Sequence, residues 1–180
     1  TGGSIKTVAA DGATSPWVSG FTFPSDLVFD SSGFGYVTHN GGTGGVIDKI
    51  AVDGTKTSNW ATGFNYAMGL AIDSNGILYA SNYANGVIGS GTIDKVSLTD
   101  GSRTQWAAGF NSPRAMVFDS ANVLYVASIN VVNGISEGSI DKVSPDGTVT
   151  FAFATGFHSA SALAFDNSTG VLYVSNGFGV

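Results

Sequence analysis

The stretch that decides the fold is Leu70-Ala-Ile-Asp73-Ser-Asn-Gly76-Ile-Leu-Tyr79-Ala-Ser-Asn82. An apolar run ends in Asp, a Ser/Asn/Gly turn follows, and a second apolar run begins, which is the pattern of two strands joined by a turn. The same pattern recurs three more times along the chain, at residues 24–37, 113–126 and 161–174. Four copies of one unit predict a repeat architecture.

A second half completes each unit. After Asn82 comes a loop rich in Gly and Asn, then the run Ile93-Asp-Lys-Val96, an Asp100-Gly101 turn, and a fourth run that carries Trp106. Asp-Gly between apolar runs favours a tight hairpin, because Gly accepts the positive φ that the turn needs. Each unit of about 45 residues therefore predicts four strands in sequence, and no segment keeps the 3.6-residue apolar period of a helix.

Composition agrees with a single all-β domain and excludes several functions. Of the 180 residues, 11% are charged, 26 are Gly and none is Cys. The net charge of −6 argues against a nucleic-acid partner, because no basic stripe could neutralise phosphates. The absence of Cys excludes disulfides and thiolate metal sites. No apolar run is long enough to predict a membrane span.

The two ends of the chain are out of phase with the repeat. The chain begins with the second half of a unit (Ile5-Lys-Thr-Val8, then Asp11-Gly12 and Trp17) and ends with the first half of one. The Asp that closes each first strand recurs at intervals of 43, 46 and 47 residues, and joining the two ends gives a fourth interval of 44. The chain thus holds four whole units in circular phase.

This phase predicts a β-propeller of four four-stranded blades, whose last blade is closed by the N-terminal strands. Two alternatives stay open: the half-blades are exchanged between chains, giving a dimer or a filament, or the chain is a piece of a larger propeller. The expected organisation is one repeat domain, 1–180, made of a half-blade at 1–21, repeats at 24–64, 67–110 and 113–157, and a half-blade at 160–180.

The units resemble the NHL-type repeats of the streptogramin-lyase-like and gluconolactonase-like β-propellers. The resemblance lies in residues 70–82, in Ile93-Asp-Lys-Val96 and in Asp100-Gly101, and the repeat extends it over nearly the whole chain. It implies a propeller fold. It also implies one of three functions, because proteins of these families include lyases, lactonases and non-enzymatic recognition domains. The enzymes of this resemblance generally have six blades and a central metal held by acidic and amide side chains.

Candidate ligand-binding residues are expected on the face that carries the unequal second-to-third strand loops. They are His39, Asn40, Asn82, Tyr83, Arg114, Glu137, His158 and Asn176, with Phe23, Asp26 and Tyr66 expected nearby. The two histidines could act as base or metal ligand, although surface loop histidines are the simpler interpretation. Asn40, Asn82 and Asn176 are expected at one repeat position. They could bind Ca²⁺ through amide oxygens or stabilise turns, which is the favoured interpretation.

Three recurring sets have structural interpretations. Asp30, Asp73, Asp119 and Asp166 precede turns and are expected to accept backbone N–H groups. Asp48-Lys49, Asp94-Lys95 and Asp141-Lys142 are expected to be exposed strand pairs. The aromatic set is expected to pack between blades, or alternatively to stack sugars as in a multivalent lectin; its members are Trp17, Trp60, Trp106 and Phe153.

The leading functional hypothesis is a non-enzymatic extracellular or cell-surface propeller that acts as a binding or assembly module. Self-association by half-blade exchange and a glycan or small-molecule ligand are the expected partners. No catalytic residues, metal ligands or required cofactor are predicted. The alternatives are a lyase- or lactonase-type enzyme with a site at the channel mouth, and a multivalent lectin.

Overall fold

The computed structural model describes residues 2–40, 44–84, 87–132 and 135–177, and all of its named elements are strands. Three four-stranded antiparallel sheets form the body of the molecule. Blade 1 consists of β3 (Asp26–Phe29), β4 (Gly35–Asn40), β5 (Gly45–Ile50) and β6 (Lys56–Phe64); blade 2 of β7 (Ala67–Ile72), β8 (Leu78–Asn82), β9 (Gly91–Val96) and β10 (Arg103–Phe110); and blade 3 of β11 (Pro113–Phe118), β12 (Leu124–Val132), β13 (Ile135–Val143) and β14 (Val149–Phe157).

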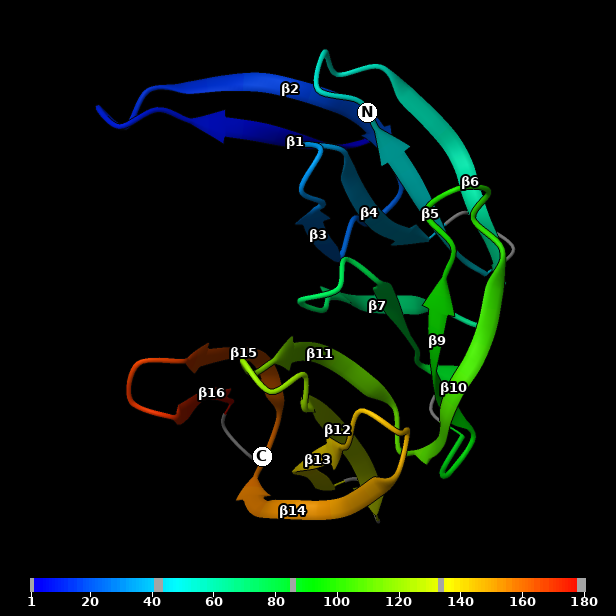
Figure 1. The fold of residues 1–180 in the computed structure, drawn as a ribbon, viewed down its shortest axis with the longest axis vertical. Coiled ribbons are helices and arrows are strands. Elements are labelled where there is room, and N and C mark those ends of the chain that lie inside the picture. The colour runs from blue at the N-terminus through cyan, green and yellow to red at the C-terminus, as the bar shows by residue number, and fades with distance from the viewer. Residues whose placement is uncertain (1, 41–43, 85–86, 133–134, 178–180) are drawn as a thin grey trace.

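Two hairpins flank the three blades. The N-terminal hairpin pairs β1 (Gly3–Val8) with β2 (Thr14–Phe21), and the C-terminal hairpin pairs β15 (Ala160–Asp166) with β16 (Val171–Asn176). The sheets follow one another around an arc, with the first strand of each blade on the inside of the curve and the fourth on the outside (Figure 1). This is the arrangement of a β-propeller, so the all-β repeat fold is confirmed.

The first strand of each complete blade ends in the same carboxylate-centred turn. Oδ1 of Asp30 accepts the backbone N–H groups of Ser32 (2.9 Å) and Phe34 (3.0 Å), while Oδ2 accepts the hydroxyl of Tyr36 (2.9 Å). Asp73 makes the same bonds in blade 2, including one from the Tyr79 hydroxyl. The repeating Asp–Tyr spacing in the sequence thus encodes a bond that ties the second strand to the turn.

Aromatic and aliphatic side chains fill the wedges between sheets. Tyr36 and Ile47 of blade 1 are fully buried against Leu70 and Leu78 of blade 2, and a similar cluster joins blade 2 to blade 3. The outer aromatic residues join this packing: the Trp60 ring lies 5.2 Å from that of Tyr36. The core is therefore divided among the interfaces between consecutive sheets, and side-chain size at these interfaces sets the curvature of the arc.

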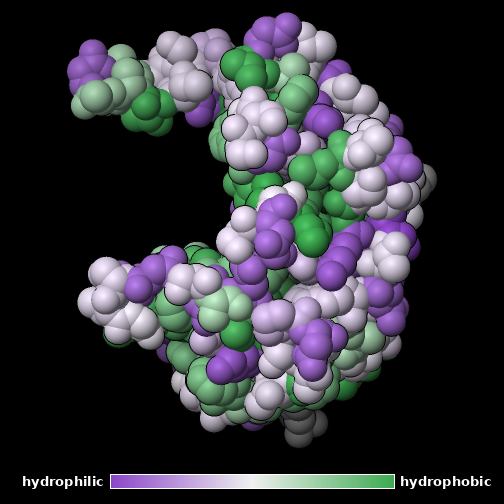
Figure 2. All heavy atoms as spheres, in the orientation of Figure 1, coloured by the Kyte–Doolittle hydropathy of each residue, from purple (hydrophilic) through white to green (hydrophobic). Residues whose placement is uncertain are grey.

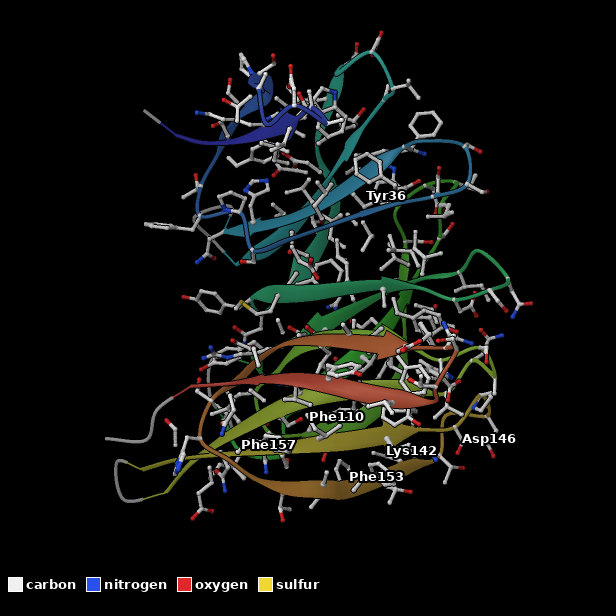
Figure 3. The ribbon with its side chains drawn as sticks, turned by 90° about the vertical axis from the view of Figure 1, so that its left-hand side faces the viewer. Tyr36, Phe110, Lys142, Asp146, Phe153 and Phe157 are labelled. Carbon is white, nitrogen blue, oxygen red and sulfur yellow. The ribbon has the colours of Figure 1, made fainter. Side chains whose placement is uncertain are left out.

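A lysine caps each aromatic stack from the solvent side. In blade 3, Lys142 Nζ lies 5.2 Å from the Phe153 ring centroid and 5.9 Å from that of Tyr125 (Figure 3). Lys49 and Lys95 take the same position in blades 1 and 2. Such cation–π contacts contribute roughly 0.5–1 kcal/mol each at exposed sites.

Closure within the chain, the main expectation from the repeat phase, is not observed. The two hairpins are separate two-stranded sheets at opposite ends of the arc (Figure 1). The repeat count fixes how many strands the chain supplies but not how sharply successive sheets turn. Among the described residues, no helix is long and apolar enough to cross a bilayer.

Among the described residues, the outer strand of blade 3 differs from the other outer strands in what lies against its last glycine. Gly20, Gly63 and Gly109 end their outer strands in equivalent places, and each lies against a side chain of the following blade, from Lys56, Arg103 and Phe151 respectively. A Cβ built on Gly156, the fourth member, would meet nothing within 4 Å. Half-blade exchange between copies would cover this position and stays a prediction.

Candidate functional site

A groove on the inner side of the arc is lined by the first strands of blades 1 to 3 and of the C-terminal hairpin. Its volume is about 590 Å³. Figure 2 shows the hollow on this side of the molecule. By strand register, two rows of equivalent residues line this axial groove: Ser25, Met68, Arg114 and Ser161 in one, and Asp26, Gly69, Ala115 and Ala162 in the next.

Small residues in the second row allow the first strands to approach closely. A Cβ built on Gly69 would overlap the carbonyl oxygen of Arg114 and lie 3.0 Å from its carbonyl carbon. Hydroxyl groups bridge the same contact, because Ser81 Oγ donates to the Arg114 carbonyl (2.9 Å) and accepts the Gly69 N–H (2.7 Å). The close approach of the two first strands therefore requires a residue without a side chain at Gly69.

Asp26 is the only carboxylate among the groove-lining residues. Its Oδ1 accepts the N–H of Leu27 (2.8 Å) and its Oδ2 accepts the N–H of Leu70 in the next blade (2.8 Å). Burial raises the pKa of Asp26, although both backbone hydrogen bonds act in the opposite direction. A carboxyl group held rigidly with a raised pKa can exchange a proton with a bound ligand.

Arg114 places a cation beside the same groove. Its guanidinium lies 5.4 Å from the ring centroid of Tyr83. Its buried Nε has no hydrogen-bond partner within the described parts of the chain. A stacked guanidinium with free donors is suited to an anionic or carbonyl oxygen. Arg114 and Tyr83, which the sequence placed on the same face, thus lie in contact with each other.

His39 is not a surface loop residue, contrary to the simpler sequence interpretation. It lies in β4, is 7% exposed, and its Nε2 is 3.0 Å from Oδ2 of Asp48. The two atoms meet the distance of an ion pair but not the geometry of a hydrogen bond. The Phe21 ring packs edge-on at 5.5 Å. The sheet formed by β1 and β2 covers this histidine, so it cannot reach a ligand in the axial groove.

Asp48 and its counterparts correct a second expectation. Asp48, Asp94 and Asp141 are 0%, 1% and 3% exposed, rather than lying on an exposed strand face. Their side of each sheet is covered by the preceding sheet. Oδ1 of Asp48 accepts the N–H of Asn59 (2.7 Å), where β6 departs from regular pairing. This set stabilises the blades from within.

The asparagines hold the connections between blades. Oδ1 of Asn82 accepts the N–H of Asn65 (2.8 Å), and Oδ1 of Asn176 accepts the N–H of His158 (2.8 Å). Asn40 is not their equivalent, because the register places His39 at that position and Asn40 one residue further on. No insertion separates the two strands, because Tyr36 pairs with Lys49 as Tyr79 pairs with Lys95; a histidine replaces the asparagine in blade 1.

Glu137 and His158 come together in a separate groove on blade 3, with a volume of about 470 Å³. The predicted ligand-binding residues are therefore divided. Arg114 and Tyr83 belong to the axial side, Glu137 and His158 to blade 3, and His39 to a sheet interface. Asn82 and Asn176 support connections. The sequence placed Asp26 near the candidate residues but not among the ligand-binding ones, although it is the one acidic residue in the two rows that line the groove.

A central divalent cation does not fit the residues of the axial groove. Ca²⁺ prefers six to eight oxygen ligands with several carboxylates, whereas Asp26 is the one carboxylate there and both its oxygens bind backbone N–H groups. Within the described residues, no three His, Cys, Asp or Glu side chains are grouped to hold a metal ion.

The successive four-stranded sheets and the axial groove have the arrangement of a β-propeller, and the solved structures of a gluconolactonase and of a virginiamycin B lyase share this fold, as the sequence resemblance implied. A gluconolactonase from Xanthomonas campestris superposes with a TM-score of 0.73 at 18% identity, over 97% of this chain and 62% of the other. Virginiamycin B lyase from Staphylococcus aureus gives 0.61 at 16%, over 89% and 52%. The PQQ-bound aldose sugar dehydrogenase from Streptomyces coelicolor gives 0.62 at 15%, over 84% and 57%. No family model and no curated protein sequence matches the chain.

These similarities overturn the leading functional hypothesis. The matched propellers are enzymes, whereas the sequence favoured a non-enzymatic binding or assembly module. The chain spans about 62% of the length of the gluconolactonase. The absence of any recognisable catalytic motif misled the sequence argument, because catalytic groups in a propeller come from separate blades and have no shared local motif.

Proposed function

We propose that the chain carries lactonase- or lyase-type chemistry on a small oxygen-rich substrate bound in the axial groove. The observation that supports this proposal most directly is that Asp26 and Arg114 line one groove whose other walls are apolar or small. A volume of about 590 Å³ lies within the roughly 300–1,000 Å³ that is typical of small-molecule sites.

Asp26 would act as the general base and Arg114 as the group that polarises the substrate carbonyl. In a lactonase, the Asp26 carboxylate removes a proton from water as the water attacks the ring carbonyl, and the Arg114 guanidinium stabilises the oxyanion that forms. In a lyase, the same carboxylate removes a proton from the carbon next to a carbonyl and the guanidinium stabilises the enolate; the enolate then forms a carbon–carbon double bond as the bond from the β-carbon to the leaving oxygen breaks, and the proton on Asp26 passes to water or to the departing group. Both reactions place base and cation on either side of one substrate.

The raised pKa of Asp26 suits this role. Burial is the main cause of the shift, so the carboxylate is a stronger base than a solvated one, while the N–H groups of Leu27 and Leu70 hold it in one orientation. The rate should rise with pH as the Asp26 carboxyl group loses its proton, giving an acidic limb in the pH–rate profile.

The test is to assay the purified chain for hydrolysis of gluconolactone and for cleavage of virginiamycin B, comparing wild type with Asp26→Asn and Arg114→Lys. Loss of a general base lowers the rate by about 10²–10⁴-fold, and Asp26→Asn should abolish the acidic limb. Asp53→Asn, in an exposed turn, is the control for charge and should match wild type.

Folding must be checked beside activity, because Asp26 also bonds to blade 2. Circular dichroism and thermal melts would show whether each variant retains its fold. Turnover by wild type together with full activity in a folded Asp26→Asn variant would contradict the assignment of the base. No turnover of either substrate by wild type would contradict the proposed reaction class for this chain.

A further inference from the structure

The axial groove changes from polar to apolar along the first strands. Its lining comes from four successive rows of positions that are equivalent by strand register, counted in the direction of the chain. The polar side chains of the lining belong to the first two rows and are Ser25, Asp26, Arg114 and Ser161. The side chains that line it from the next two rows are Leu70, Met116, Leu163 and Val28. The groove therefore has a polar end and an apolar end.

The apolar end carries no polar side chain on any of these four first strands. The third row is Leu27, Leu70, Met116 and Leu163, and the fourth is Val28, Ala71, Val117 and Ala164. Successive residues of a strand rise by about 3.3 Å, so this end begins beside the row of Asp26 and extends about 7 Å from it. A substrate hydroxyl buried there would meet no polar side chain, and burying a hydroxyl without a hydrogen bond is unfavourable. An alkyl chain has no such requirement.

The cores between the sheets hold the apolar end in place from behind. Val28 packs against the cluster of buried side chains between blades 1 and 2, which includes Leu70. Met116 belongs to the cluster between blades 2 and 3, and Leu163 packs against the one between blade 3 and the C-terminal hairpin. Leu70 and Met116 are only 2% and 7% exposed. The apolar surface is thus formed before a ligand arrives, as is usual for small-molecule sites.

Both methionines of the chain line this groove. Met116 lies at the apolar end, whereas Met68 is half-buried in the same row as Arg114. A methionine side chain is flexible and polarisable, so it adapts to apolar ligands of different shape. The two methyl groups therefore mark the two ends of the groove.

We propose that the substrate of the axial groove is an amphiphilic lactone, with an oxygen-rich ring and an alkyl chain. The ring carbonyl lies between Asp26 and Arg114, and the chain lies against Leu70, Met116 and Leu163. This inference rests on the proposed function and names the substrate class that the function leaves open. The reaction is the hydrolysis described above: the water oxygen bonds to the carbonyl carbon, the ring C–O bond breaks, and the proton taken by Asp26 passes to the departing ring oxygen, giving a hydroxy acid.

The first measurement is kcat/KM for a series of lactones that differ only in chain length: γ-butyrolactone, γ-hexalactone, γ-octalactone and γ-decalactone. Removing one CH₂ group from water is worth up to about fourfold in affinity. We expect kcat/KM to rise by about two- to fourfold for each added CH₂ group. Gluconolactone, which has hydroxyl groups instead of an alkyl chain, should be turned over with a lower kcat/KM than γ-decalactone.

Val28→Thr tests the apolar end directly, because threonine keeps the shape of valine and adds one hydroxyl group. The gain in kcat/KM per CH₂ group should become smaller in this variant. Val52→Thr makes the same change at a residue that is 70% exposed, and it should keep the gain of wild type. Circular dichroism and thermal melts would show that both variants are folded at the assay temperature.

Binding can be measured without any reaction. In 3-hexylcyclopentanone a CH₂ group replaces the ring oxygen of γ-decalactone, so this ketone cannot be hydrolysed. Protein labelled with ¹³C at the methionine methyl groups should show saturable shifts of both the Met68 and the Met116 signals on titration with it. Cyclopentanone, which lacks the chain, should bind more weakly and shift the Met116 signal less. Met68→Leu assigns the two signals.

The outcomes separate this inference from the proposed function. Saturable Met116 shifts with 3-hexylcyclopentanone but no hydrolysis of any lactone would support the ligand class and contradict the proposed reaction. Lactone hydrolysis that does not depend on chain length, or that is faster with gluconolactone than with γ-decalactone, would overturn the amphiphilic substrate and leave the reaction standing. The absence of a saturable Met116 shift with the ketone would overturn it too.

Discussion

Gly69 offers the sharpest test of how the blades are held at the axis. Its backbone is not in the left-handed region, so the cost of an alanine there comes only from steric overlap of its Cβ with neighbouring atoms. The added Cβ would overlap the Arg114 carbonyl oxygen and lie 3.0 Å from its carbon and 3.3 Å from the Ala115 Cα. Carbon atoms pack best at about 3.5–4.0 Å, so β11 must move away from β7 by at least about half an ångström.

The expected loss of stability follows from this displacement. Overpacking of this kind typically destabilises by about 1–3 kcal/mol. We expect Gly69→Ala to lie at the upper end, because the obstacle is backbone rather than a flexible side chain. The shift would also break the Ser81 bridge between the strands and distort the axial groove, so substrate turnover should fall with stability.

Gly76→Ala is the matched control. Gly76 has φ of +78° and a Cβ there would meet nothing within 4 Å, so this change adds only the left-handed strain of about 1–2 kcal/mol. Urea unfolding followed by tryptophan fluorescence gives both free energies, with equal m-values required. If Gly69→Ala unfolds within about 0.5 kcal/mol of wild type, the close approach of β7 and β11 described above is refuted.

Three further outcomes are expected. Burial, with the Asp73 charge as the next cause, raises the pKa of Tyr79 to about 12. The protonated Tyr79 hydroxyl should therefore stabilise the folded protein fully below pH 10, and this stabilisation should be lost as pH rises from about 10 to 12. Alkaline ultraviolet titration and pH-dependent melts of wild type and Tyr79→Phe would measure both. Hydrogen bonds from Ser168 and Thr169 lower the pKa of Asp166 to about 2; its stabilising effect should be present above about pH 4 and be lost as pH falls toward 2, and a ¹³C carboxyl titration giving a value near 4 would contradict this. In blade 2, Ser81 of the second strand pairs with Ile93 of the third. If copies exchange half-blades, the equivalent residues Ser175 and Ile5 of two copies should pair in the same way, so Ser175→Cys should form an intermolecular disulfide with Ile5→Cys. A purely monomeric product after oxidation would count against exchange.

Most of the fold could be predicted from the sequence because local chemistry determines it. The Asp–Tyr spacing encodes the turn at Asp30, and Asp-Gly encodes the hairpin after each third strand. Curvature could not be predicted, because it depends on how side chains such as Tyr36 and Leu70 fill the wedge between two sheets. Closure failed as a prediction for that reason.

The site was predictable only in part. Arg114 and Tyr83 were singled out from their loop positions and do come together. Asp26 was expected near the candidate residues but was not predicted to bind a ligand, because its role depends on the Leu70 N–H of a neighbouring blade. The burial of His39 and Asp48 was missed because a third sheet, formed by β1 and β2, covers them. Contacts between sheets carry no periodic signal within one strand.

The division of the core among consecutive sheet interfaces has a consequence for how the molecule opens. In such an array, stability is approximately a sum of nearest-neighbour terms, as in a one-dimensional lattice. Blade 2 has a complete sheet on each side, whereas each terminal hairpin has one neighbour. Amide hydrogen exchange should therefore be slowest in β8 and β9 and fastest in β1 and β16, so that unfolding proceeds inward from both ends of the arc.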